Sequence, residues 1–128
     1  MERKYAYISI PITGYDIKER IETSKFVAEI LGLRGYQTYN PLDLAVKFPG
    51  KSWEWYMEQD LKELHAGVNA LFLCPGWRNS RGCKIEYEEA LTINKNPGKN
   101  IEIYEVTAWS NKPYFRTSWL ATRQIKQK

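Results

Sequence analysis

The feature that most constrains the fold is a short, almost entirely apolar segment near the middle of the chain, residues 69–74 (NALFLC), which ends at Pro75-Gly76. A strand that is apolar along its length is buried on both faces, and such strands are typical of the centre of a parallel sheet. Other strand-like segments, rich in β-branched and aromatic residues, lie at residues 5–10, 36–39 and 101–106. Residues 69–74 therefore predict the central strand of a sheet.

Segments with helical periodicity separate these strands. Asp16 is the predicted N-cap of a first helix, Ser52 begins a second that runs to about residue 66, and a third follows Gly82 and ends near Asn94. Residues 42–51 are expected to be irregular, residues 95–100 a turn, and residues 117–127 a terminal helix. The residues expected on one side of the first helix are Ile17, Ile21, Ser24, Ala28 and Leu31.

Strands that alternate with helices favour one α/β domain over residues 1–128, in which residues 107–128 are the least determined part. We expect a doubly wound, flavodoxin-like parallel sheet of four to five strands, in the order 2-1-3-4(-5), with helices on both faces. In such a sheet ligands bind beyond the carboxyl ends of the strands, at the point where the chain reverses direction across the sheet. Residues 11–15 and 75–82 therefore mark the expected site.

Composition narrows the classes of function. The two cysteines and one histidine lack metal-ligand spacing, so we expect no metal and no cofactor. Residues 1–4 do not resemble a signal peptide, and no stretch approaches the roughly 18 apolar residues of a membrane span. We expect a cytoplasmic protein that contacts no membrane.

The net charge is +4, and the basic excess lies near the end of the chain. Such a tail either binds nucleic acid or a phosphate-bearing ligand, or is a solvated terminus. We favour the solvated terminus and expect no nucleic-acid partner. The basic residues after Glu105 are Lys112, Arg116, Arg123, Lys126 and Lys128.

Two carboxylates do not fit the packing pattern. Asp60 falls inside the apolar arc of the second helix, and Glu86 shares the inward face of the third helix with Ala90 and Ile93. A carboxylate directed toward a core costs several kcal/mol unless it is paired or faces a cleft. Structural alternatives are backbone binding by Asp60 and complementarity of Glu86 to the helix dipole. The helix phase instead predicts that both carboxylates converge on the switch point.

The loops at the switch point contain no phosphate-binding fingerprint. Residues 12–14 (ITG) match neither GxGxxG nor GxxxxGK[ST], which disfavours a dinucleotide domain or a P-loop enzyme. The polar loop 77–82 offers groups for a phosphate or a sugar hydroxyl. Cys83 lies near a helix N-terminus, where a lowered pKa would make it a nucleophile, but His65 is predicted to point elsewhere and no base is available.

Several motifs together resemble a known family. They are YISIPITG at residues 7–14, Asn40-Pro41, WxxYMxxDL at residues 53–61, LCPGW at residues 73–77 and SRGxxxE at residues 80–86. In order and spacing they are similar to small bacterial and phage proteins related to nucleoside 2-deoxyribosyltransferases and to 2′-deoxynucleoside 5′-phosphate N-hydrolases. The resemblance covers about residues 5–106.

The resemblance implies cleavage or transfer at the N-glycosidic bond of a (deoxy)nucleoside or nucleoside monophosphate. Glu86 matches the catalytic glutamate, Asp60 the helix aspartate beside the base, and Tyr7 the tyrosine that orients the glutamate. The implied substrate-binding residues are Pro11, Ile12, Thr13, Gly14, Asn40, Trp77, Ser80 and Gly82. Ile10 stands where the group often has glycine, and Thr13 where nucleotide hydrolases can carry arginine, which leaves the substrate open.

The resemblance also implies a homodimer or larger homo-oligomer in which a neighbour's tail closes the site. Trp109, Tyr114 and Trp119 are the residues of the tail suited to that contact. A non-catalytic protein that binds or sequesters a nucleotide on the same fold is the alternative function. A third hypothesis, a nucleic-acid-binding module, would use residues 107–128.

Overall fold

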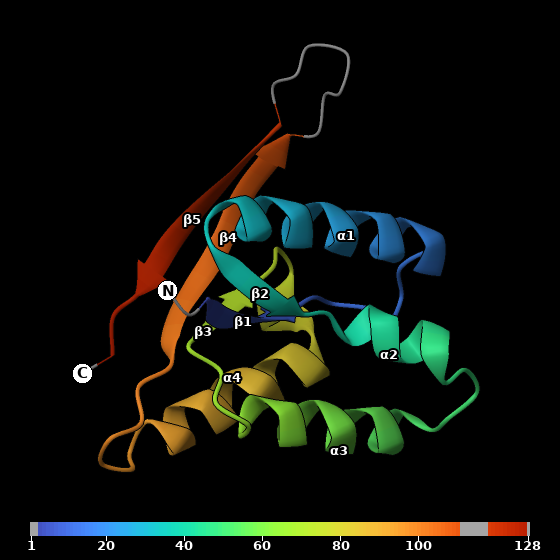
Figure 1. Cartoon of the computed structure of the whole chain (residues 1–128). Helices are drawn as coiled ribbons and strands as arrows, with labels where there is room; N and C mark the ends of the chain where they lie inside the picture. The colour runs from blue at the N-terminus through green and yellow to red at the C-terminus, as the bar shows by residue number, and fades with distance from the viewer. Residues whose placement is uncertain (1–2, 111–117, 128) are drawn as a thin grey trace.

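The structure is a computed structural model that describes residues 3–110 and 118–127. It is an α/β fold with a five-stranded sheet in the order β2-β1-β3-β4-β5 (Figure 1). The strands are β1 (Lys4–Ser9), β2 (Tyr36–Tyr39), β3 (Ala70–Leu73), β4 (Glu102–Ser110) and β5 (Trp119–Ile125). The helices are α1 (Ile17–Leu33), α2 (Pro41–Lys47), α3 (Trp53–Leu64) and α4 (Arg81–Ile93), and a 3₁₀ turn, η1 (Trp77–Asn79), precedes α4.

The predicted strand order is confirmed, and the first four strands are parallel. The last strand differs from the parallel sheet that we expected, because β5 returns antiparallel to β4. An antiparallel neighbour needs only a hairpin connection, whereas a parallel one needs a crossover of a dozen or more residues. The eight residues between β4 and β5 are too few for that crossover.

Two local predictions are wrong. The terminal helix expected over residues 117–127 is strand β5, where Leu120 inserts into the core while β4 supplies the hydrogen bonds. The irregular segment expected over residues 42–51 contains α2, which Asn40 caps by accepting a hydrogen bond from the Leu42 amide and which Pro41 begins. Proline at the first helical position fits because its missing N–H has no partner there.

The sheet has a helical layer on each face (Figure 1). Alternate residues of β3 belong to different cores: Ala70 and Phe72 pack with α1, whereas Leu71 and Leu73 pack with α3 and α4. This alternation explains why the segment is apolar at every position. The buried face of α1 is centred on Arg20, Ser24, Val27 and Leu31, while Ile17, which we expected to be inward, is 46% exposed.

The loops that follow β1 and β3 lie next to each other at the carboxyl edge of the sheet. The Cys74 amide donates to the Ser9 carbonyl at 2.8 Å, which extends the pairing of these strands to their ends. The switch point predicted from the strand order is therefore present. Within the described ranges, no helix combines the length and the apolar character needed to cross a bilayer.

Candidate functional site

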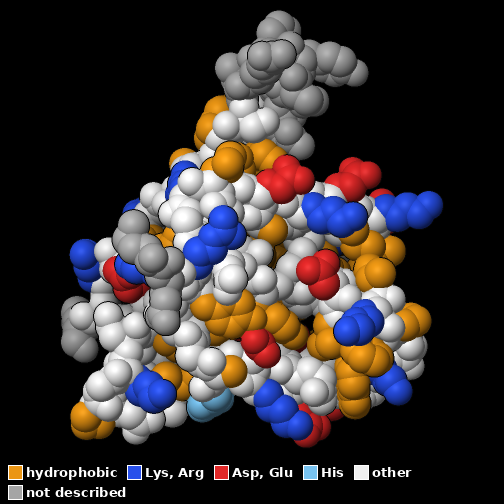
Figure 2. Space-filling model, viewed as in Figure 1, with side chains coloured by type: hydrophobic (Ala, Val, Ile, Leu, Met, Phe, Trp, Pro, Cys, Tyr) orange, Lys and Arg blue, Asp and Glu red, His pale blue; other side chains and the backbone are white. Residues whose placement is uncertain are grey.

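A cleft of about 790 Å³ opens at this switch point. It is bounded by the loop after β1, the N-terminal parts of α2 and α3, and the segment that leads into α4. Its apolar lining includes Ile12, Ile17 and Ala45, together with Trp53, Tyr56 and Met57 at the start of α3. In Figure 2 hydrophobic side chains gather on the side where α2 and the start of α3 lie in Figure 1. The cleft thus has an apolar wall, as small-molecule sites usually do.

Glu86 lies at the base of the cleft and is only 4% exposed. Its Oε1 accepts a hydrogen bond from the Ser9 hydroxyl at 2.7 Å, and its Oε2 accepts one from the Tyr7 hydroxyl. Burial raises the pKa of Glu86 to about 8, although both hydrogen bonds act to lower it. Two residues of one strand, β1, therefore fix both oxygens of a carboxylate carried by α4.

Asp60 enters the same cleft from α3 and is 6% exposed. Its Oδ1 accepts a hydrogen bond of 2.8 Å from the Tyr39 hydroxyl. Burial raises the pKa of Asp60 to about 6, while this hydrogen bond acts to lower it. The charge of Asp60 also raises the pKa of Glu86. Because two buried carboxylates repel each other when both are ionised, the pair retains one proton near neutral pH.

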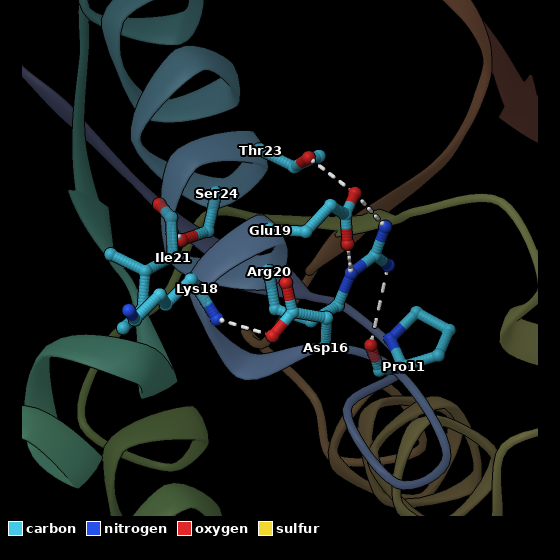
Figure 3. Close-up of polar contacts among 8 residues, drawn as sticks. All are labelled: Pro11, Asp16, Lys18, Glu19, Arg20, Ile21, Thr23 and Ser24. Carbon is cyan, nitrogen blue, oxygen red and sulfur yellow. Dashed lines mark hydrogen bonds and ion pairs between the residues drawn. The ribbon is translucent and has the colours of Figure 1, made fainter.

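The loop after β1 is anchored by a buried arginine of α1 (Figure 3). Arg20 donates from Nη1 to the Pro11 carbonyl at 3.3 Å, and its guanidinium carbon lies 4.3 Å from the centre of the Tyr15 ring. Glu19 accepts two hydrogen bonds from the same guanidinium, at 2.5 and 2.6 Å, and Thr23 holds Glu19 at 2.8 Å. Figure 3 shows Asp16 capping the start of this helix through the Lys18 amide. The anchored loop forms one wall of the cleft.

Tyr15 connects this loop to the loop after β3. A Cβ atom placed on Gly76 would lie 3.0 Å from the Tyr15 hydroxyl and 3.5 Å from Pro11 Cγ. Gly76 also has a φ of +88°, a conformation that side chains other than glycine rarely adopt. Glycine at this position thus permits both the turn and the approach of Tyr15.

The start of α4 forms another wall of the cleft. Ser80 is its N-cap and accepts a hydrogen bond from the Cys83 amide at 3.3 Å. The guanidinium of Arg81 lies 4.3 Å from the centre of the Trp53 ring, so α3 and α4 meet at the mouth of the cleft. At Gly82, a Cβ atom would lie 3.4 Å from Met57 Sδ, which shows how closely the two helices approach.

The structure brings most of the expected site residues together. Asp60 and Glu86 line the cleft, Tyr7 lies behind Glu86 without an exposed surface, and Gly14 belongs to the anchored loop. Asn40 is instead the buried cap of α2, where its side chain also donates to Ser24 at 2.9 Å. The other expected residues that line the cleft are Pro11, Ile12, Thr13, Ser80 and Gly82.

Trp77 faces a second, smaller pocket of about 330 Å³. Its indole N–H donates to Glu105 at 3.0 Å, and Arg78 and Arg123 both form ion pairs with that carboxylate. The hydrogen bonds and both arginine charges lower the pKa of Glu105 against the effect of burial. Trp77 is therefore placed beside the cleft rather than in its lining.

Sequence reasoning missed Ser9, Tyr39 and Trp53 as parts of the site, whereas Tyr15 and Arg81 fall in the two loops that it marked. For Ser9 a signal existed, since it is a polar residue at the buried end of β1 and lies two positions after Tyr7 on the same face. For Tyr39 the signal was its place at the carboxyl end of β2.

Cys83 does not have the lowered pKa that its place near a helix N-terminus allowed, which agrees with our preference against a cysteine nucleophile. Cys83 is buried, and burial raises the pKa of its thiol to about 11, with a further increase from the Glu86 charge. His65 lies at the end of α3 and contacts Glu89 at 2.8 Å, away from the cleft lining. Across residues 3–110 and 118–127, no cluster of three or more His, Cys, Asp or Glu side chains suits a metal ion. Lys112, Tyr114, Arg116 and Lys128 lie outside the described residues.

Residues 4–97 match the family described as "Domain of unknown function (DUF4406)". The match extends from β1 to just beyond α4 and includes every residue that lines the cleft. Strands β4 and β5 follow the matched segment. No curated protein matches the chain. The chain therefore belongs to the DUF4406 family, and the cleft lies within the part that the family shares.

Proposed function

We propose that this DUF4406 protein cleaves or transfers at the N-glycosidic bond of a (deoxy)nucleoside or nucleoside monophosphate. The observation that supports the proposal is the pair of buried carboxylates, Glu86 and Asp60, which reach one cleft from two different helices. Two carboxyl groups on either side of a glycosidic bond are the usual catalytic equipment for its cleavage. Their raised pKa values fit a site that must hold one proton and one negative charge near neutral pH.

In the reactive form that we propose, the proton shared by the pair lies on Asp60, and the ionised Glu86 attacks the anomeric carbon C1′ of the sugar. A bond forms between C1′ and a Glu86 oxygen while the bond from C1′ to the base nitrogen breaks, and the electron pair of that bond leaves with the base. Asp60 donates its proton to the departing base and becomes a carboxylate. The products of this step are a free base and a glycosyl ester on Glu86.

In the second step Asp60 accepts the proton of an incoming water, whose oxygen forms a bond with C1′ and releases Glu86 as a carboxylate. A second base in place of water gives transfer rather than hydrolysis. Tyr7 and Ser9 donate to Glu86 at both stages and hold its oxygens toward the cleft. Such preorganised donors stabilise the charge that returns to the carboxylate.

The shape of the cleft fits a nucleoside. Aromatic side chains of Tyr15, Trp53 and Tyr56 line the apolar part, which suits the face of a base. The polar part, formed by Ser80 and the backbone at the start of α4, suits sugar hydroxyls or a 5′-phosphate. A cytoplasmic location and a homo-oligomer that closes the cleft belong to the same proposal.

The test is chromatography of a panel of nucleosides, deoxynucleosides and their monophosphates after incubation with the protein, with and without a second base. The expected result is base release or exchange by the wild type and its loss, by at least about a thousandfold, in Glu86→Gln. Glu89→Gln is a matched control on the same helix, because Glu89 contacts His65 outside the cleft. Absence of turnover for every panel member by the wild type would overturn the proposal.

A non-catalytic nucleotide-binding protein is the second candidate. It is favoured by the raised pKa of Glu86, since a carboxyl group that keeps its proton to about pH 8 donates a hydrogen bond rather than attacking a carbon. On this hypothesis calorimetry detects binding of a nucleoside or nucleotide that Glu86→Gln retains, and no base appears at any pH. Binding accompanied by base release decides for the enzyme.

A further inference from the structure

Tyrosines of the two strands β1 and β2 reach carboxylates on the helices that cover them. Tyr7 donates to Glu86 of α4, and Tyr39 donates to Asp60 of α3 at 2.8 Å. A third pair, Tyr5 with Glu63, lies farther along β1 and outside the cleft lining. The same kind of contact therefore occurs at both cleft carboxylates and at one carboxylate that does not face the cleft.

The two cleft pairs are set by strand register. Tyr7 and Tyr39 are directly paired positions of the parallel strands β1 and β2, and their ring centres are 5.1 Å apart. Because the sheet fixes the two rings side by side, it also fixes the two hydroxyl groups. The spacing between Asp60 and Glu86 thus depends on the sheet as well as on how α3 and α4 pack.

The oxygens of Asp60 are in different environments. Oδ1 accepts the hydrogen bond from Tyr39, whereas Oδ2 has no hydrogen-bond partner among the described residues. In the same part of the chain, every fully buried side-chain oxygen has a hydrogen-bond partner, so an oxygen without a partner is not fully buried. Oδ2 is therefore open to the cleft that Asp60 lines. Glu86 differs, because each of its two carboxylate oxygens accepts a hydrogen bond from a hydroxyl group, of Tyr7 or of Ser9.

We propose that Tyr39 is a positioning residue for Asp60: by holding Oδ1 it turns Oδ2 into the cleft, where Oδ2 carries the proton that goes to the leaving base. The inference rests on the proposed function and adds the atom and the residue that direct proton transfer. A proton on Oδ1 would compete with the hydrogen bond that the Tyr39 hydroxyl donates to this oxygen, so the proton of Asp60 is better placed on Oδ2. When Asp60 is protonated, Tyr39 therefore favours the arrangement in which the proton lies on Oδ2 and is directed toward the substrate.

The groups that face Asp60 define what else influences its titration. Glu86 approaches from α4, Tyr7 from β1 and Tyr39 from β2, and Glu63 lies one turn along α3. From α2 the cleft receives Pro41 and Ala45, which do not titrate. Arg81 lies across the cleft with its guanidinium on Trp53. Among these groups Tyr39 donates the hydrogen bond that lowers the pKa of Asp60.

The decisive variant is Tyr39→Phe, which keeps the ring beside Tyr7 and removes the hydroxyl. We expect the Asp60 pKa to rise above the value of about 6. The alkaline limb of the pH–rate profile, where the acid loses its proton, should move upward with it. We expect kcat to fall roughly tenfold with little change in KM, since an oriented hydrogen bond to the acid is lost. Asp60 is followed directly by ¹³C NMR of its carboxyl carbon, assigned with Asp60→Asn.

The matched control is Tyr5→Phe, which removes a hydroxyl contact with another carboxylate of the same helix. It should leave the titration of Asp60, the pH profile and kcat as in the wild type. An unchanged Asp60 titration in Tyr39→Phe, or an equal change in Tyr5→Phe, would overturn the inference and leave Tyr39 with a structural role. The NMR titration requires no substrate. Failure of the proposed function therefore appears separately, as a wild type that releases no base.

Discussion

At the scale of single residues, the cleft combines two carboxylates with three hydroxyl groups from the ends of β1 and β2. Ser9 and Tyr7 fix Glu86, and Tyr39 fixes Asp60. Burial raises the pKa of both acids, while the hydroxyl groups act in the opposite direction. The balance keeps a proton and a charge together on two buried side chains, which is the arrangement that acid–base chemistry at neutral pH requires.

The pH dependence of kcat/KM follows from this pair. Below about pH 6 both carboxyl groups are protonated and no nucleophile is available, and above about pH 8 both are ionised and no acid remains. We therefore expect a bell-shaped profile with limbs near these values, whichever residue holds the shared proton. In Asp60→Asn the limb due to Asp60 should disappear, and the Glu86 pKa should fall because the neighbouring charge is gone. A profile that is flat between pH 5 and pH 9 would contradict the shared-proton description.

At the scale of elements, loops anchored on both sides of the switch point shape the cleft. Arg20 holds the loop after β1 through the Pro11 carbonyl and the Tyr15 ring. Tyr15 in turn lies against Gly76 in the loop after β3. The antiparallel strands β4 and β5 support this arrangement from the opposite edge of the sheet, because Leu120 of β5 reaches the core that α1 covers.

Gly76→Ala tests the contact between the two loops. The positive φ should cost about 1–2 kcal/mol of stability, and the new methyl group should displace Tyr15 and raise KM. Gly98→Ala is the matched control, since Gly98 has a φ of +83° but no atom within 4 Å of the added Cβ. Thermal unfolding should show similar losses for both variants, and steady-state kinetics a raised KM for Gly76→Ala. Equal kinetics in the two variants would mean that Tyr15 does not shape the substrate site.

Leu120→Ala tests whether β5 is an integral part of the sheet. Leu120 is 5% exposed, and its truncation should destabilise the protein by about 2–4 kcal/mol in urea unfolding. Trp119→Ala serves as the control on the same strand. Because Trp119 is 48% exposed, its truncation should remove less buried surface and destabilise the protein less than Leu120→Ala. A loss below about 0.5 kcal/mol for Leu120→Ala would contradict the packing of β5 on the core.

At the scale of the whole molecule, the site is held at a cost in stability. A buried acid whose folded-state pKa is raised favours the folded state while it is protonated, and this contribution is lost as the pH rises through the folded pKa. For Glu86 the contribution is complete below the ordinary value of 4.5 and is lost by about pH 8. Glu105 behaves in the opposite sense. Its lowered pKa stabilises the folded state at pH values above the ordinary pKa of a glutamate, and this contribution is lost as the pH falls through the lowered pKa.

Glu86→Gln should therefore stabilise the protein while it abolishes activity. The gain relative to wild type should be small at pH 5 and about 2–4 kcal/mol at pH 8, since the glutamine stays neutral while the glutamate must ionise in a buried site. Urea unfolding of both proteins at the two pH values measures the difference. A gain that is equal at pH 5 and pH 8, or a destabilisation at pH 8, would show that ionisation of Glu86 carries no such cost.

The sequence by itself determined the parts of this protein that local patterns encode. The apolar run at residues 69–74 indicated a central strand, strand–helix alternation indicated the order 2-1-3-4, and that order indicated the switch point. Helix phase brought Asp60 and Glu86 to the inner faces of α3 and α4, where the structure places them. These inferences succeeded because burial imposes a period of 3.6 or 2 on the chain wherever an element packs.

Only the tertiary structure decided which groups surround those carboxylates and how the sheet ends. Tyr39 and Asp60 are 21 positions apart and Ser9 and Glu86 are 77 apart, so no local pattern reports their contact. The direction of β5 was likewise decided by pairing with β4 and by the burial of Leu120, which overrode a pattern that we had interpreted as a helix. The pKa of Cys83 was set by burial rather than by its place near a helix N-terminus. Each of these properties depends on what packs from elsewhere in the chain.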